Sequence, residues 1–149
     1  MTRLHDILTA QENARYAMKE GTDVHAKLRR VVIDGELQRG DSVYVEQIQS
    51  RDDLRPFFKA NSRTEVPIAG TIDGRFVSRR IDRLVVDDIA QTVLVMDYKT
   101  DVNRDVFVDA YYAQVREYGV LLRAIYPTYQ IKGFILWVHD FSLENVPMK

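Results

Sequence analysis

Two acidic side chains interrupt the apolar segments of the stretch 79–100, RRIDRLVVDDIAQTVLVMDYKT. Asp82 lies in the first apolar run and Asp97 in the second, and a polar turn separates the runs. Both runs are short and rich in β-branched residues, which favours a hairpin of buried strands over a helix. A symmetric turn places Asp82 opposite Asp97, and because side chains alternate along a strand, Lys99 joins them on the same sheet face.

Such a carboxylate pair needs a partner. Directly opposed side chains lie roughly 5 Å apart at their Cβ atoms, so like charges there repel. The repulsion is about 1 kcal/mol in water and roughly 3 kcal/mol at an effective dielectric of about 20. Because Asp82→Asn removes this repulsion, it is predicted to raise the melting temperature of the metal-free protein. A divalent cation reverses the sign, because hard cations prefer carboxylate oxygens. Ordinary ion pairs with Arg80, Arg83 and Lys99 are the alternative, although the apolar surroundings favour a cation site.

The same residues form a D…DxK pattern, in which fourteen residues separate Asp82 from Asp97-Tyr98-Lys99. With the strings IDR at 81–83 and DYKTD at 97–101, this pattern resembles the signature of the PD-(D/E)xK nuclease superfamily. The likeness is to its RecB/AddA-type exonuclease domains, which form the C-terminal ends of bacterial helicase-nucleases. It implies a restriction-endonuclease-like α/β fold, an αβββαβ core with a mixed central sheet flanked by helices.

The resemblance also implies an activity, that of a Mg²⁺- or Mn²⁺-dependent deoxyribonuclease acting exonucleolytically in DNA recombination and repair. Asp82, Asp97 and the backbone carbonyl of Tyr98 would hold the metal, and Lys99 would position the attacking water or stabilise the oxyanion. The implied partners are single-stranded DNA ends and the helicase domains of a parent protein. Two alternatives stay open: a non-catalytic DNA- or protein-binding module on the same fold, and a structure-specific or restriction-type endonuclease.

A histidine and a glutamate are further candidates. His25 lies beside an apolar stripe at helical spacing, in the string GTDVHAKL. The string resembles the histidine motif of the same nuclease branch and implies a third metal ligand, whereas a lone histidine is more often structural. A histidine ring must be neutral to bind a metal, so the metal affinity should fall as pH drops through about 6.5. Two nearby carboxylates raise the pKa of the ring and move this loss of affinity to somewhat higher pH. Glu65, at the start of a strand, is a peripheral candidate, with a solvated glutamate as the alternative.

Periodicity and turn signals predict the elements that position these residues. Residues 2–33 are expected to be helical, and 105–126 form a second helix with Asp105 as its N-cap. The segment 42–49 fits either a helix or a strand, and 53–59 fits a short helix. The predicted strands are 64–70, 75–87, 92–100 and 131–140. The first three form a meander with Asp73-Gly74 as one of its turns.

The predicted helix 105–126 carries two sets of side chains. Its buried stripe is expected to consist of Val108, Tyr111, Val115, Leu122 and Ile125. The string YYAQVREY resembles the Q…Y motif that follows DYKT in RecB-type nucleases. That resemblance implies that Gln114 and Tyr118 support the active site and contact the DNA strand. A core tyrosine and a boundary glutamine are the alternative.

Composition limits the classes of function. The 149 residues, 46% hydrophobic and 29% charged, fit one globular domain spanning 1–149. The count of 0 cysteines excludes disulfides, zinc–thiolate sites and iron–sulfur clusters. A net charge of −1 gives no general support for nucleic-acid binding. Any phosphate contacts would then come from a local basic cluster, formed by Arg51, Arg55, Lys59 and Arg63. The alternative is that this cluster is an ordinary solvated face.

The sequence also predicts a location and a context. It holds no apolar run near about 18 residues and no signal-peptide core at the N-terminus, which predicts a cytoplasmic protein without membrane contact. A GxxxxGK[ST] phosphate loop is absent, so the motor half of a helicase-nuclease is missing. The chain is expected to be a stand-alone nuclease or an excised domain of a larger helicase-nuclease, and its start within a helix favours the second.

Overall fold

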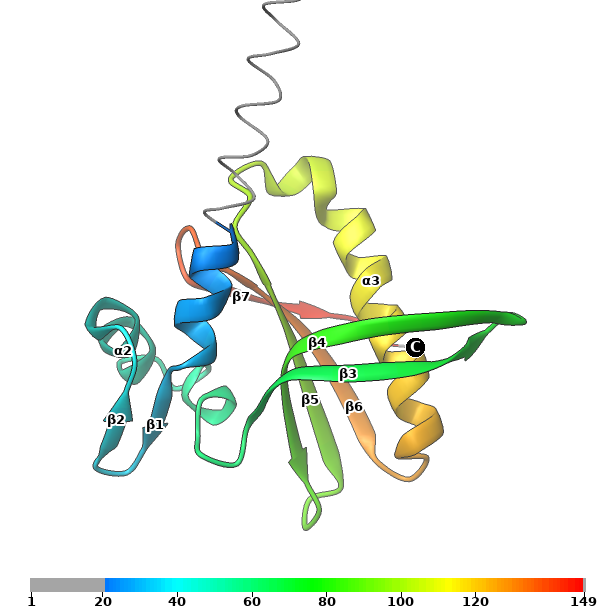
Figure 1. The fold of residues 1–149 in the computed structure, drawn as a ribbon, viewed down its shortest axis with the longest axis horizontal. Helices are drawn as coiled ribbons and strands as arrows, with labels where there is room; N and C mark the ends of the chain where they lie inside the picture. Colours follow the sequence, from blue (N-terminus) through cyan, green and yellow to red (C-terminus); the bar gives the residue numbers. More distant parts are fainter. Residues whose placement is uncertain (1–20, 149) are drawn as a thin grey trace, which may run out of the picture.

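The centre of the molecule is a five-stranded mixed β-sheet (Figure 1). The computed structural model describes residues 21–148. Within them the strands lie side by side in chain order, and every neighbouring pair is antiparallel except β5 and β6. The strands are β3 (Arg63–Ile72), β4 (Arg75–Asp87), β5 (Thr92–Lys99), β6 (Gln130–Trp137) and β7 (Ser142–Val146). The predicted α/β class with a mixed central sheet is therefore confirmed.

One long helix, α3 (Arg104–Ile125), joins β5 to β6 and covers one face of the sheet. Parallel strands need such a crossover, because a tight turn cannot return the chain to the same end. Val115, Tyr118 and Leu122 of α3 belong to the same buried cluster as Val95 and Ile135 of the sheet. We call the face that bears this cluster the α3 face.

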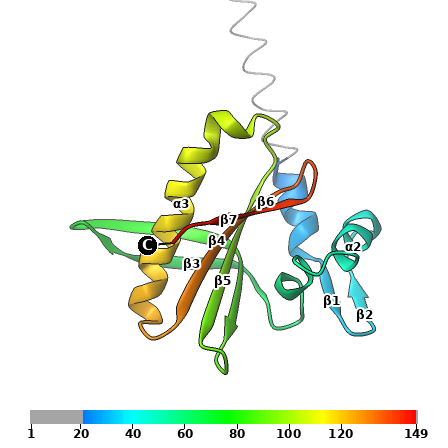
Figure 2. The same cartoon turned by 180° about the vertical axis from the view of Figure 1, so that it is seen from behind.

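The elements from the first half of the chain cover the opposite face. These are a helix at 21–29, β1 (Val32–Asp34), β2 (Leu37–Arg39), α2 (Ser42–Gln49) and the 3₁₀ turn η1 (Arg55–Phe57). Leu28, Ile48 and Phe58 pack there with Met96 and Leu136 of the sheet. Figures 1 and 2 show α3 and these elements on opposite sides of β5. None of the helices described in residues 21–148 is long and apolar enough to span a bilayer.

Several element boundaries differ from the sequence predictions. The predicted helix 2–33 ends at residue 29, and its part before residue 21 lies outside the described residues. The β-branched run 31–33 and Gly35, with φ of 62°, turn the chain into the β1–β2 hairpin instead. The segment 42–49, open in sequence, is a helix because Asp41 caps it by accepting from the Val43 and Tyr44 amides.

Two details of the second predicted helix are also wrong. Its N-cap is Asn103, and Asp105 lies in the first turn, where a negative charge complements the helix dipole. Ile125, predicted to be buried, is 56% exposed, whereas Leu121 is buried in the cluster on the α3 face. The helix therefore turns a slightly different face to the sheet near its C-terminal end.

The β3–β4 hairpin leaves the sheet as an arm, and Figure 1 shows it running across the direction of β5 and β6. β4 pairs with β3 over most of its length but with β5 only between Arg83 and Asp87. Ile81 and Leu84 both pack on the α3 face, although three residues apart they should point to opposite sides of a straight strand. The residues facing α3 therefore change parity at Asp82, opposite which β3 carries Glu65 at φ of 55°.

Next to this switch, Arg83 is 1% exposed and reaches to the side of the sheet opposite α3. Its guanidinium donates to the carbonyl oxygens of Leu28 at 2.8 Å and Phe57 at 3.1 Å, and to the Tyr98 hydroxyl at 2.7 Å. It also lies 4.1 Å from the centroid of the Phe58 ring. Arg83 thus joins the helix at 21–29 and the 3₁₀ turn to the sheet through one side chain.

Replacing Arg83 by methionine should destabilise the fold strongly. The apolar side chain fills similar volume but leaves buried carbonyl groups without a donor, a loss on the order of 3 kcal/mol. Urea denaturation followed by circular dichroism measures the change. Arg39→Met, at an exposed position of β2, is the matched control and should be near neutral. Equal stability of the two variants would contradict the role given to Arg83.

Candidate functional site

The hairpin register predicted from the sequence is confirmed. Arg83 pairs with Met96 and Leu84 with Val95, and the same register, continued one step beyond the last paired residues, brings Asp82 to Asp97. The two carboxylates are close enough to share a hydrogen bond. β4 and β5 diverge at this point, so the carboxylates meet where the sheet opens.

Asp82 lies where the alternation along β4 changes. Its neighbours point to opposite sides, Ile81 toward α3 and Arg83 away from it. The backbone N–H of Tyr98 donates to Asp82 Oδ2 at 2.8 Å. The Asp82 carboxylate therefore lies against the backbone of β5 beside Asp97, and its place on the same sheet face stays a prediction.

His25 reaches the carboxylates from the helix at 21–29. Its Nε2 lies 3.4 Å from Asp82 Oδ2, and Nδ1 donates to the carbonyl of Gly21 at 2.7 Å. The ring also packs 5.4 Å from the Tyr98 ring, centroid to centroid. The hydrogen bond to Asp82 outweighs burial and raises the pKa of His25 to about 9. The structure therefore brings His25 to the predicted site, as a protonated partner of Asp82.

Asp97 is the buried member of the pair, at 3% exposure. Burial and then the nearby charge of Asp82 raise the pKa of Asp97 to about 7. Burial also opposes ionisation of Asp82, but hydrogen bonds from His25, Asp97 and the Tyr98 amide prevail and lower its pKa. The two carboxylates, equivalent in sequence, are thus distinguished by their surroundings: Asp82 holds the negative charge and Asp97 retains a proton more readily.

Lys99 lies on the α3 face beside Asp97. Its Nζ lies 2.8 Å from Asp97 Oδ2 and donates to Gln114 Oε1 at 2.9 Å. The ammonium also stands 4.2 Å from the centroid of the Tyr111 ring, a cation–π contact. Three groups thus fix the position of one charge.

The predicted pair Gln114 and Tyr118 continues this network along α3. Gln114 Nε2 donates to the Tyr118 hydroxyl at 2.9 Å, and that hydroxyl donates to the carbonyl of Arg80 at 3.5 Å. Residues four apart lie on one helix face, so α3 presents both to the sheet. The sequence missed Asp101, which accepts a hydrogen bond from the Tyr111 hydroxyl, although it closes the DYKTD string.

Glu65 and the basic cluster lie at the margin. Glu65 Oε2 stands 3.2 Å from Arg80 Nη1, beside the opening but without contact to the carboxylates, as a peripheral role would require. In the predicted basic cluster, Arg51 pairs with Asp53 and Arg55 pairs with Asp52. Those arginines are neutralised by their own neighbours, which favours the solvated-face interpretation.

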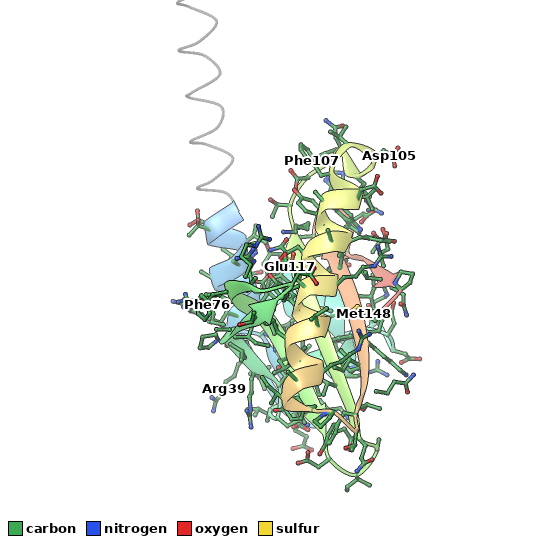
Figure 3. All side chains as sticks on the ribbon, turned by 90° about the vertical axis from the view of Figure 1, so that its right-hand side faces the viewer. Arg39, Phe76, Asp105, Phe107, Glu117 and Met148 are labelled. Carbon is green, nitrogen blue, oxygen red and sulfur yellow. The ribbon has the colours of Figure 1, made fainter. Side chains whose placement is uncertain are left out.

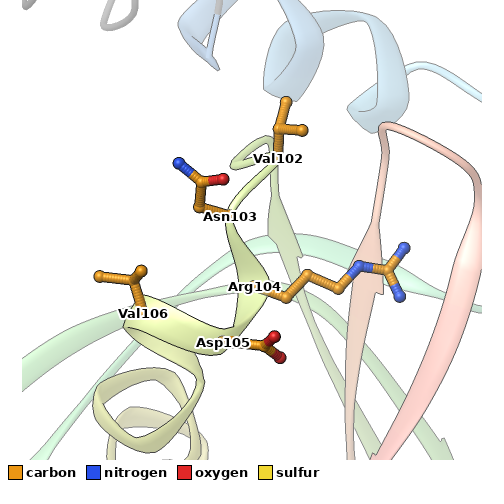
Figure 4. Close-up of a pocket in the computed structure, with 5 residues that line it drawn as sticks. All are labelled: Val102, Asn103, Arg104, Asp105 and Val106. Atoms are coloured by element: carbon orange, nitrogen blue, oxygen red, sulfur yellow. The ribbon is translucent and has the colours of Figure 1, made fainter.

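A hollow in the surface lies away from these residues, at the start of α3, where residues 102–106 line it (Figure 4). Arg104, the basic side chain of that segment, forms an ion pair with Asp140. Figure 4 shows its guanidinium pointing toward the adjacent β-strands and away from Asn103. None of the predicted site residues lines this hollow, so it gives no support to a second site.

The carboxylate site holds one atom that suits a metal ion. Among residues 21–148 no cluster of three or more His, Cys, Asp or Glu side chains is arranged as a ready-made metal site. One atom nevertheless fits a cation: Asp97 Oδ2 is buried and accepts no hydrogen bond of favourable geometry, even with the Lys99 ammonium beside it. A buried carboxylate oxygen in that state is a suitable ligand for a hard cation.

No family model matches the chain, and no curated protein matches it either.

The raised pKa of His25 can be measured directly. In the metal-free protein its ring should titrate near pH 9, followed by NMR and assigned with His25→Gln. Folded His25 binds its proton more tightly than the unfolded chain, so the stability it contributes is complete below about 6.5 and disappears as pH rises toward 9. Asp82→Asn removes the partner and should return the pKa of His25 toward 6.5. A His25 pKa that stays near 9 in the Asp82→Asn protein would contradict the pairing.

The two carboxylates should respond oppositely to neutralisation, which revises the prediction made for Asp82 from sequence. Ionisation of Asp97 destabilises the metal-free fold as pH rises from about 4 to 7, because the pKa of Asp97 is higher in the folded protein. Asp97→Asn should therefore raise the free energy of unfolding at pH 8 by on the order of 2 kcal/mol, which corresponds to about 4–8 °C in Tm. Asp82→Asn should lower the Tm because it removes the partner of His25. Calorimetry in EDTA at pH 8 and at pH 4, where the Asp97 effect should vanish, decides between them.

Proposed function

We propose that the protein is a divalent-metal-dependent deoxyribonuclease. The observation that carries this proposal is the meeting of Asp82, Asp97 and Lys99 at the opening between β4 and β5, with Gln114 bound to the lysine. The residues come from three elements, and each fits the position that the D…DxK resemblance implies. A further support is the order β3, β4, β5, α3, β6 around them, which fits the βββαβ part of the implied core, although β1, β2 and α2 separate the helix at 21–29 from β3.

The carboxylates would hold the metal, Mg²⁺ or Mn²⁺. Asp97 offers its buried Oδ2, which accepts no hydrogen bond although it lies beside the Lys99 ammonium. Asp82 offers its carboxylate at the opening, and His25 offers a ring nitrogen once it loses its proton. The resemblance adds the backbone carbonyl of Tyr98. A bound divalent cation lowers the pKa of a bound water and neutralises charge that develops on the phosphate.

Lys99 would stabilise negative charge beside the carboxylates. Its ammonium is only 17% exposed and is held by Gln114 and the Tyr111 ring, so it needs little rearrangement when charge develops on a phosphate oxygen. Gln114 in turn is positioned by Tyr118. We therefore assign Lys99 to transition-state stabilisation or to holding the attacking water, and Gln114 and Tyr118 to positioning Lys99.

Protonation of His25 competes with ligand binding. Since its pKa is raised to about 9, a cation must displace a proton at neutral pH. This places the expected pH dependence of metal affinity higher than the value near 6.5 expected for an unperturbed ring. Asp97 also makes metal affinity increase with pH, since its carboxyl group ionises fully only above its raised pKa of about 7.

Cleavage of end-labelled linear and circular single-stranded DNA, with Mg²⁺, Mn²⁺ or EDTA, tests the proposal. Asp97→Ala and Lys99→Ala should each lower the rate by about 10²–10³-fold or more, because each removes a charge used in the transition state. Lys132→Ala, an exposed lysine of β6, is the matched control and should retain the wild-type rate.

The choice of substrate separates the alternatives. Loss of the linear strand alone indicates an exonuclease, and loss of both strands indicates an endonuclease. Activity in EDTA, or an Asp97→Ala protein that cuts at the wild-type rate, would refute the metal-dependent mechanism. DNA binding without cleavage under every metal condition would favour the non-catalytic module.

A further inference from the structure

The outer face of the β3–β4 arm is a feature that the proposed chemistry does not use. On β4 the odd-numbered residues Val77, Arg79 and Ile81 face α3, because two of them are buried there and Arg79 pairs with Glu117 of that helix. Their neighbours therefore point to the other side of the arm. We call this outer side the arm face, formed by Phe76, Ser78 and Arg80 with their partners Thr71, Ala69 and Pro67.

The arm face is exposed, flat and carries one large aromatic ring. Phe76 is 72% exposed and the Arg80 side chain 68% exposed, while the residues between them, Ser78 and Ala69, are small. Figure 3 shows Phe76 on the side of the hairpin away from α3. An uncovered ring beside small residues offers a stacking surface that no other side chain occupies.

The arm face carries one arginine. Residues 75–80, RFVSRR, hold three arginines, but Arg75 and Arg79 have the parity that faces α3, where Arg79 pairs with Glu117. Arg80 pairs with Glu65 at 3.2 Å, at a position exposed enough for a phosphate to compete. An aromatic ring and an arginine on one face match what single-stranded nucleic acid needs, a base stack and a phosphate contact.

The arm face leads directly to the carboxylates. The row Phe76, Ser78, Arg80 ends next to Asp82, where the alternation changes, and the six steps of strand from Phe76 to Asp82 span about 20 Å. A chain lying along this row would reach the opening between β4 and β5. Stacking on Phe76 requires an unpaired base, which favours a single strand over a duplex, since duplex bases already stack on one another.

We propose that the arm face binds the single strand next to the bond that is cleaved, with a base on Phe76 and a phosphate at Arg80. The inference rests on the proposed function, for which it names the form of the substrate and the path by which it reaches the site. Phe76 and Arg80 are binding residues in this scheme and take no part in the reacting centre.

Binding without cleavage tests the arm face separately from the chemistry. The anisotropy of a labelled oligothymidylate is titrated with protein in EDTA at several salt concentrations. Phe76→Ala should weaken binding about tenfold, the effect of one lost base stack. Arg80→Gln should reduce the slope of log K against log salt by about 0.7, as expected for one phosphate contact on a single strand.

Two matched variants serve as controls. Ile89→Ala removes an apolar side chain that is 98% exposed at the β4–β5 turn, and Arg39→Gln removes an exposed arginine of β2. Both should bind as the wild type does. Equal affinity of Phe76→Ala and Ile89→Ala would overturn the proposal, and so would an equal loss on duplex DNA. Dimerisation of the wild type that Phe76→Ala abolishes, seen by sedimentation, would overturn it in favour of self-association.

Cleavage assays then separate this proposal from the proposed function. A dinucleotide is too short to reach Phe76, so its cleavage should not change in Phe76→Ala, whereas cleavage of the long oligothymidylate should fall about tenfold at limiting substrate. Cleavage of both substrates without dependence on Phe76 would refute the arm face and leave the nuclease. Binding that depends on Phe76 without any cleavage would refute the nuclease and retain the arm face as a nucleic-acid site.

Discussion

The buried charge of Arg83 is the constraint on which the site depends. Among the described residues, no carboxylate forms an ion pair with its guanidinium, which donates to carbonyl oxygens at the end of the helix at 21–29, where the helix dipole is negative. A buried arginine so placed fixes the distance and direction of that helix from β4. Asp82 adjoins Arg83 in the chain, and His25 lies about one turn before Leu28. One interaction therefore aligns both partners of the His25–Asp82 contact.

The site also shows how a protein keeps two carboxylates together. Each has its own cation: His25 stands beside Asp82, and Lys99 stands beside Asp97. A proton provides the rest of the compensation, since burial and like charge raise the pKa of Asp97 while Asp82 remains the ionised member. The arrangement is stable through side chains alone, yet it leaves one buried oxygen of Asp97 without a hydrogen bond. In the proposed function, that oxygen is the one that a divalent cation would satisfy.

The sequence could predict what local rules determine. The β4–β5 register followed from two apolar runs and a symmetric turn, and α3 followed from its periodicity. The end of the first helix was missed because helical spacing of apolar residues outweighed the β-branched run 31–33. The role of Arg83 depends on carbonyl groups that tertiary packing brings to it from other elements. The sequence suggested Arg83 only as an ion-pair partner of Asp82, because it does not show which backbone groups will lie nearby.

The change of alternation at Asp82 has a reason that is visible in the sequence. Leu84 and Val86 have one parity and Val77 and Ile81 the other, so a straight β4 would turn either pair away from α3. A change of parity at Asp82 places all four apolar residues on the α3 side, three of them buried and Val86 partly buried, and Glu65 with its positive φ lies opposite it on the paired strand. Such local irregularities recur at functional sites, because regular alternation cannot serve two demands at once.

The same irregularity couples the arm to the site mechanically. Above Arg83 the strand belongs to the central sheet, and below Asp82 it belongs to the arm, so Asp82 is the residue at which two differently directed hairpins join. Its carboxylate is held by the β5 amide of Tyr98 on one side and its backbone by the arm on the other. A force that moves the arm must therefore either carry Asp82 with it or break the 2.8 Å hydrogen bond to Tyr98. The arm face and the carboxylate pair are therefore connected by one continuous strand, without any intervening loop.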